Sequence, residues 1–182
     1  MAFLTLQEVR NKARSKTSTG LESREALNRQ FQFDSISPDK TYDIFLSHAF
    51  LDAETIYGLK IILEEAKFSV YVDWYEDSHL DRGKVTKKTA EIIRKRMKSC
   101  KSLIYAITEN SGDSKWMVWE LGYFDGFRGK VAILGLTENS EDGFQSQEFL
   151  ELYPFVERHD LGLVMKDDPT KPAKLLRDWV KF

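Results

Sequence analysis

The amino-acid sequence predicts an α/β fold in which a parallel β-sheet is covered by helices on both faces. Short apolar segments alternate along the chain with longer segments whose apolar residues recur at helical spacing. Alternation of this kind is typical of parallel sheets, because parallel strands need a long crossover connection that a helix supplies. The 182 residues suggest one such domain.

Five apolar segments are expected to form the strands. The segment SLIYAIT is apolar throughout, which favours a central strand buried on both faces. The predicted strands are 41–47, 68–74, 102–108, 130–136 and 152–156.

A helix is expected after each of these strands. Asp52 is the expected N-cap of the first helix, since a carboxylate accepts hydrogen bonds from the free N–H groups there. The predicted helices are 52–66, 86–98, 115–127, 145–151 and 169–181.

Residues 1–38 precede this pattern and are mostly polar. They contain two helical patches: Phe3, Leu4, Leu6 and Val9 can share one helix face, and residues 21–31 hold the other patch. We therefore expect a helical N-terminal extension over 1–38 that packs on the main domain, 39–182, or on a partner.

Composition excludes several classes of function. The net charge of −2 gives no reason to expect nucleic-acid binding, and no apolar run is long enough to cross a membrane. Cys100 is the only cysteine, so no internal disulfide is expected and a cytoplasmic location fits best. The three histidines lie far apart in the sequence, and we expect no metal site.

Three segments resemble one known family. They are YDIFLSHA at 42–49, VDWYEDSHLDRGKVT at 72–86 with its L-x-R-G signature, and NSGDSKWMVWEL at 110–121. Their order and spacing are similar to those of TIR (Toll/interleukin-1 receptor) domains, over residues from about 40 to about 160. Met117 departs from the pattern, because many TIR domains have cysteine there.

The resemblance implies a flavodoxin-like three-layer fold with a five-stranded parallel sheet. Within this family, the chain resembles the small stand-alone bacterial TIR proteins of the antiphage Thoeris type. Such enzymes cleave the nicotinamide–ribose bond of NAD+, which is substrate and not cofactor. The products expected from the resemblance are nicotinamide and ADP-ribose, or a cyclic or conjugated ADP-ribose signal that a downstream effector would sense.

Glu120 is the expected catalytic residue, at the position of the family's catalytic glutamate. Nicotinamide leaves as a neutral molecule, so the leaving group needs no acid, and a carboxylate can stabilise the cationic ribose. For an arbitrary glutamate, the usual interpretation would be a solvated residue on a helix surface. Trp116, one helical turn earlier, falls on the same face and is expected either to bind nicotinamide or to pack in the core.

Other candidate substrate-binding residues follow the first and second strands, where ligands bind in open α/β sheets. Ser47, His48 and Phe50 could contact nicotinamide or ribose, although His48 could equally be a structural histidine. The second group is Trp74, Asp81, Arg82 and Gly83. Gly83 is expected to permit a turn, and the loop 75–84 is expected to mediate self-association.

Two other functions stay open from the sequence. A noncatalytic TIR adaptor would act through its surface loops and could retain an acidic residue at position 120. A nucleoside 2-deoxyribosyltransferase-like enzyme has a related fold and a catalytic glutamate, but the L-x-R-G loop argues against it. Release of nicotinamide from NAD+ would separate the leading prediction from the adaptor, and a deoxynucleoside substrate screen would test the transferase.

Overall fold

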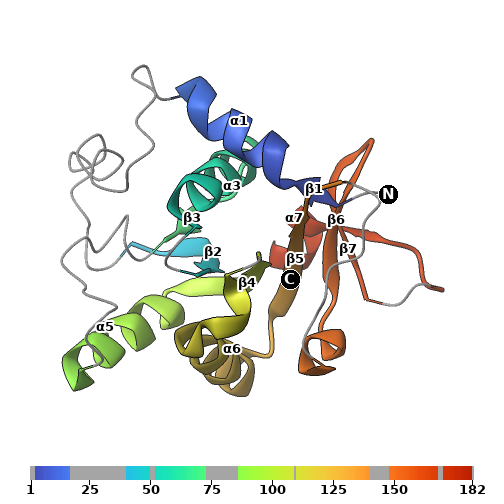
Figure 1. The fold of residues 1–182 in the computed structure, drawn as a ribbon. Helices are drawn as coiled ribbons and strands as arrows, with labels where there is room; N and C mark the ends of the chain where they lie inside the picture. The colour runs from blue at the N-terminus through green and yellow to red at the C-terminus, as the bar shows by residue number, and fades with distance from the viewer. Residues whose placement is uncertain are drawn as a thin grey trace.

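A computed structural model describes the chain in seven stretches (Figure 1). These are residues 3–16, 40–49, 52–72, 86–108, 110–139, 148–167 and 170–181.

The sheet has a core of five parallel strands, which confirms the predicted fold class. In spatial order they are β3 (Val70–Tyr71), β2 (Tyr42–Ser47), β4 (Cys100–Ile107), β5 (Val131–Thr137) and β6 (Phe155–His159). Taken in chain order, these five strands follow the 2-1-3-4-5 arrangement of flavodoxin-like sheets. The predicted strand at 152–156 begins later than expected, at Phe155.

Three further strands extend this core and were not predicted. β7 (Gly162–Lys166) and β8 (Lys174–Leu175) add antiparallel strands beyond β6, whereas β1 (Leu4–Thr5) pairs in parallel with β5. Gly162 has a φ of 112°, a conformation that glycine adopts without strain, where the chain reverses from β6 into β7. Within the described stretches the sheet is therefore mixed, with eight strands in place of the expected five.

Helices cover both faces of the sheet, as Figure 1 shows. One face packs against α1 (Leu6–Lys16), α3 (Ala53–Glu65) and α7 (Leu176–Lys181). The opposite face packs against α5 (Lys87–Lys98), α6 (Lys115–Arg128) and the 3-10 helix η3 (Glu148–Leu152), with a short 3-10 turn, η2 (Ser111–Asp113), before α6. No helix of the described stretches is long and apolar enough to cross a membrane.

Side chains of β4 alternate between these two helical layers. Leu103, Tyr105 and Ile107 belong to the core on the α5 and α6 side, whereas Ile104 and Ala106 belong to the core on the α3 side. All five are at most 5% exposed, which explains why this strand reads as continuously apolar in the sequence. The alternation also decides which residues of the strands face α6.

Part of the N-terminal extension is built into the hydrophobic core. Leu6, Val9 and Ala13 of α1 are buried against α3. Gly58 of α3 permits this close approach, because a Cβ at that position would lie 1.9 Å from the Val9 carbonyl oxygen. Leu4 lies in β1 and not in a helix, so the predicted first helical patch is shorter than expected. The second patch, at 21–31, lies outside the described residues.

Candidate active site

Ser47 and Glu120 meet at the carboxyl ends of the parallel strands. Ser47 is the last residue of β2, and its Oγ donates a hydrogen bond of 2.6 Å to Oε2 of Glu120. Both residues are 0% exposed. A carboxylate removed from water is stabilised by such a bond, and it acts electrostatically in a medium of low dielectric constant. The structure thus brings together two of the predicted site residues.

Local sequence explains where Glu120 stands. Ser114 caps α6, accepting a hydrogen bond from the backbone N–H of Met117 at 3.4 Å. This fixes the helix start, and the next turns direct Met117, Glu120 and Leu121 towards the sheet. Glu120 therefore occupies a core-facing position of the helix, which excludes the solvated-surface interpretation.

Tyr105 is a third buried polar residue beside this pair, and it was not predicted. It is the register partner of Ser47 across β2 and β4, on the face that α6 covers. Burial raises the pKa of the Tyr105 hydroxyl to about 12, and the negative charge of Glu120 contributes to the rise. The hydroxyl therefore stays protonated at neutral pH. The apolar context of Tyr105 within its strand gave no sequence signal for a polar role.

His48 follows Ser47 and is also fully buried. Its Nδ1 lies 2.9 Å from the Leu46 carbonyl oxygen. Since a carbonyl only accepts, Nδ1 carries the proton in this contact. The bond fixes the ring orientation at the end of β2, and contact of His48 with substrate stays a prediction.

Asp52 does not cap α3 as predicted, although it stands at the N-cap position. Its side chain makes no capping hydrogen bond. Instead its carboxylate accepts hydrogen bonds from Thr108 Oγ1 and, at 2.7 Å, from Asn110 Nδ2. These bonds join the segment that precedes α3 to the segment that follows β4, next to the Ser47–Glu120 pair along the carboxyl edge.

Trp116 is half-buried and contacts another aromatic ring. Its ring centroid lies 5.2 Å from that of Trp119 in an edge-to-face arrangement. Trp119 in turn stacks on Tyr123 and lies under the guanidinium of Arg94 from α5. Both tryptophans pack against the core on this face of the sheet. Packing is thus observed for Trp116, and nicotinamide binding by this residue stays a prediction.

The remaining predicted site residues lie outside the described residues. They are Phe50, Trp74, Asp81, Arg82 and Gly83. Their predicted substrate contacts, and the predicted contact loop 75–84, stay predictions.

No protein-family model matches the chain. The chain is 58% identical over 125 residues to the "Probable 3' cyclic ADP-D-ribose synthase ThsB'" of Bacillus cereus (strain MSX-D12), a match that covers 68% of this chain and 65% of that protein. It is 28% identical over 116 residues to the "Putative cyclic ADP-D-ribose synthase TIR2" of Cytobacillus dafuensis, covering 63% of this chain and 31% of that protein.

Among solved structures, the TIR domain of the Toll-related Receptor TRR-2 from Hydra magnipapillata matches with a TM-score of 0.46. The two are 18% identical, and the match covers 61% of this chain and 79% of that chain. The chain thus spans somewhat less than two thirds of the first curated relative and about a third of the second. In its three motifs, its sheet order and its similarity to these bacterial proteins, the chain resembles the TIR-domain family.

Proposed function

We propose that the chain cleaves the nicotinamide–ribose bond of NAD+ with Glu120 as the catalytic carboxylate. The observation that carries this proposal is the buried Ser47–Glu120 hydrogen bond at the carboxyl edge of the sheet. Ligands bind at this edge in open α/β sheets. The two bacterial relatives are named as cyclic ADP-D-ribose synthases, which supports the same class of reaction.

The chemistry requires one stabilised positive charge. The C1′–N bond of the nicotinamide riboside breaks, and its electron pair leaves with neutral nicotinamide. The ribose then carries oxocarbenium character, which a nearby carboxylate stabilises electrostatically. The effect is large when water is excluded, because the Coulomb energy rises as the local dielectric constant falls.

Ser47 has a defined part in this proposal. Its hydroxyl donates a hydrogen bond to one carboxylate oxygen of Glu120. Glu120 has no accessible surface, so NAD+ has to displace side chains at this edge to reach it. A ribose hydroxyl of the substrate would then donate to the carboxylate where Ser47 donates now, or share it with Ser47.

The fate of the ribosyl group depends on the attacking atom. Water gives ADP-ribose and returns one proton to solvent. Attack at C1′ by an atom of the adenosine half, with loss of its proton, closes a ring. The names of the two relatives favour the ring, and we propose a cyclic ADP-ribose as product and a signalling role in antiphage defence.

Self-association is part of the proposal as well. The loop 75–84 resembles the family's contact loop, and a second protomer placed there would help to exclude water from the site. A downstream effector that senses the product completes the proposed signalling pathway. Both partners follow from the family resemblance.

The decisive experiment is incubation of the purified chain with NAD+, followed by chromatography and mass spectrometry of the products. Nicotinamide together with a species of the mass of cyclic ADP-ribose supports the proposal. Nicotinamide with ADP-ribose alone supports cleavage and contradicts cyclisation. No nicotinamide release at any protein concentration favours the adaptor function, and base exchange on a deoxynucleoside favours the transferase.

A further inference from the structure

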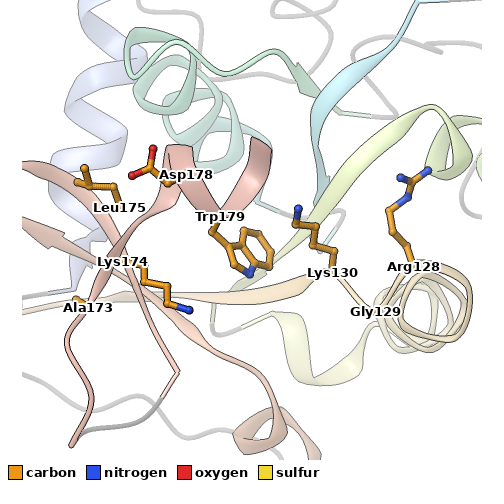
Figure 2. A pocket seen from close by; sticks show the side chains of 8 residues that line it. All are labelled: Arg128, Gly129, Lys130, Ala173, Lys174, Leu175, Asp178 and Trp179. Carbon is orange, nitrogen blue, oxygen red and sulfur yellow. The ribbon is translucent and has the colours of Figure 1, made fainter. Parts of the chain in front are cut away.

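A cationic cavity lies at the edge of the sheet opposite to Glu120. It is formed where α6 ends, β5 begins and β8 leads into α7, and it has a volume of about 730 Å³. We call it the α7 cavity and define it by Arg128, Lys130, Lys174, Asp178 and Trp179 (Figure 2). Small-molecule sites commonly have volumes in this range. Arg128 stands two turns after Glu120 on α6, roughly 12 Å along the helix axis, so the two sites are separate.

Positive charge dominates the lining of this cavity. Arg128, Lys130 and Lys174 contribute three cations, and Asp178 contributes the one carboxylate among the lining residues. Figure 2 shows the Asp178 side chain directed away from Lys130 and Arg128, on the far side of Trp179. The whole chain has a net charge of −2, so this local excess is not a property of its general composition.

Several basic residues elsewhere in the described stretches form ion pairs. Lys12, Lys101 and Arg158, for example, each form an ion pair with a carboxylate, at 2.6, 2.7 and 2.5 Å. Within the described stretches, no carboxylate lies within ion-pair distance of Arg128, Lys130 or Lys174. Among the described residues, no ion pair offsets the positive charge of these three side chains.

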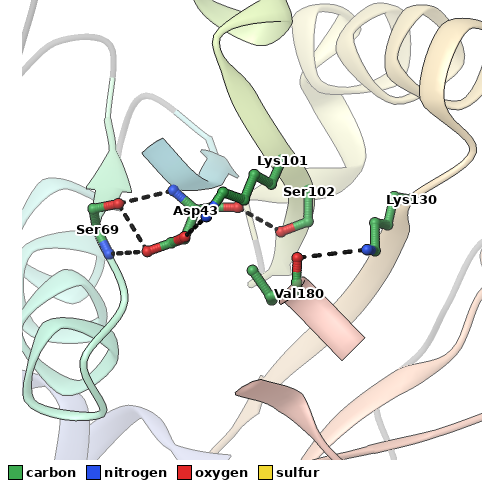
Figure 3. Close-up of polar contacts among 6 residues, drawn as sticks. All are labelled: Asp43, Ser69, Lys101, Ser102, Lys130 and Val180. Carbon is green, nitrogen blue, oxygen red and sulfur yellow. Dashed lines mark hydrogen bonds and ion pairs between the residues drawn. The ribbon is translucent and has the colours of Figure 1, made fainter. Parts of the chain in front are cut away.

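The polar contacts of Arg128 and Lys130 are weak. Lys130 Nζ donates to the Val180 carbonyl oxygen at 3.5 Å (Figure 3), and Arg128 Nη2 donates to the Lys98 carbonyl oxygen at 3.3 Å. Burial lowers the pKa of Lys130, and repulsion from Arg128 and Lys101 lowers it further. An anion in the cavity would relieve this repulsion.

An aromatic wall completes the site. Trp179 is half-buried and lines the cavity, and Lys130 Nζ lies 5.7 Å from the centre of its ring. A second cavity of about 410 Å³ shares Gly129, Lys174 and Trp179 with the first. It brings in the carboxylates of Asp125 and Asp167, which repel anions but accept hydrogen bonds from hydroxyl or amino groups.

We propose that the α7 cavity binds a nucleotide-class ligand, with its phosphates at Arg128, Lys130 and Lys174 and its ring against Trp179. Arginine binds phosphate in a planar fork and lysine binds it as a point charge, so this set of cations suits a diphosphate. The hydroxyl groups of the sugar extend towards the second cavity. Its carboxylates can accept hydrogen bonds from these hydroxyl groups and repel further anionic groups. The proposal does not depend on the activity at Glu120.

Calorimetric titration of the full chain with ADP tests this proposal, because ADP has the diphosphate and the ring but no nicotinamide to be cleaved. We expect a dissociation constant of about 1 mM or tighter at low salt, weakening as salt is added. Lys130→Gln and Lys174→Gln each remove one charge while keeping a polar side chain, and each should weaken binding about tenfold. Lys12→Gln is the matched control, because Lys12 pairs with Glu65 and does not line the cavity.

Three further variants test where ADP binds and which residues contact it. Glu120→Gln should leave ADP binding unchanged, which separates this cavity from the proposed active site. Trp179→Phe should remove most of the tryptophan fluorescence change on binding. Lys174→Glu reverses the charge of an exposed side chain. It should abolish ADP binding while a thermal melt shows that the protein stays folded.

Three outcomes would overturn the proposal. The first is no ADP binding up to about 1 mM at low salt. The second is equal ADP affinity in wild type, Lys130→Gln and Lys174→Gln. The third is loss of ADP binding in Glu120→Gln alone. Pyrophosphate binding as tightly as ADP would overturn the nucleotide ring contact and leave an anion site. Binding of adenosine as tightly as ADP would overturn the phosphate contacts.

Discussion

Ser47 Oγ donates a 2.6 Å hydrogen bond to Glu120 Oε2 across 73 residues of sequence. This bond orients the carboxylate at the end of β2, on the face that α6 covers. A side chain held in this way can stabilise developing charge without first reorganising, which is the main requirement for electrostatic catalysis.

Glu120→Gln is expected to abolish NAD+ cleavage while the protein stays folded. The amide keeps the size of the side chain and can still accept the Ser47 hydrogen bond, but it has no charge to stabilise the ribosyl cation. We expect nicotinamide release to fall by well over about a hundredfold. Liquid chromatography of the products measures this. Glu151→Gln, at an exposed position of η3, is the control and should cleave normally. Comparable activity in both variants would exclude Glu120 as the catalytic residue.

Ser47→Ala is expected to reduce cleavage about tenfold and to cost about 1–3 kcal/mol of stability, because a buried carboxylate loses one donor. The matched control is Ser102→Ala on the neighbouring strand. Ser102 is equally buried and donates at 2.8 Å to the Asp43 carbonyl oxygen, at the opposite edge of the sheet. It should lose similar stability and keep its activity. If steady-state kinetics show equal losses in both variants, Ser47 acts through stability alone.

Gly58→Ala is expected to destabilise the protein by more than about 2 kcal/mol, since overpacking forces backbone shifts. The added methyl group would lie 1.9 Å from the Val9 carbonyl oxygen and push α1 away from α3. Gly126→Ala is the control, because its Cβ would meet nothing within 4 Å, and alanine favours a helix over glycine by up to about 1 kcal/mol. Urea unfolding should place the two variants on opposite sides of the wild type. A neutral Gly58→Ala would mean that α1 does not pack on α3 in solution.

Asp43→Asn is expected to destabilise the protein at neutral pH and to have little effect in acid. Burial raises the pKa of Asp43, but hydrogen bonds from Lys101 and Ser69 outweigh it and hold the pKa below its usual value of 3.8. A lowered pKa contributes stability that is present above pH 3.8 and is lost as the pH falls through the folded-state pKa. We expect a loss on the order of 1 kcal/mol at pH 7, because Asp43 is partly exposed. Thermal melts from pH 7 down to about pH 3 measure it. A pH-independent difference would contradict the assignment.

Specific activity is expected to rise with protein concentration, since the proposed function includes self-association through the loop 75–84. Arg82→Ala should lower both assembly and cleavage while Glu120 is still present. Light scattering with NAD+ bound, run beside the nicotinamide assay over about a hundredfold range of concentration, measures both quantities. A monomer with constant specific activity would exclude this role of the loop.

The sequence alone determined the layered α/β architecture, the five parallel strands and the edge at which Ser47 and Glu120 lie. These features are encoded locally, because strand and helix periods and caps such as Ser114 depend on neighbouring residues. The sequence did not predict β1, β7 or β8. Two of these are two-residue strands whose pairing depends on a partner distant in sequence, and β7 depends on the chain reversal at Gly162.

Only the tertiary structure decided which distant groups meet. The register of β2 on β4 sets Tyr105 beside Ser47, and the packing of α6 brings Glu120 to both. Asp52 lies at the expected N-cap position, yet its carboxylate accepts hydrogen bonds from Thr108 and Asn110 and not from the helix. The cations of the α7 cavity come from segments more than 40 residues apart. Such contacts follow from how complete elements pack together, which no local pattern of residues records.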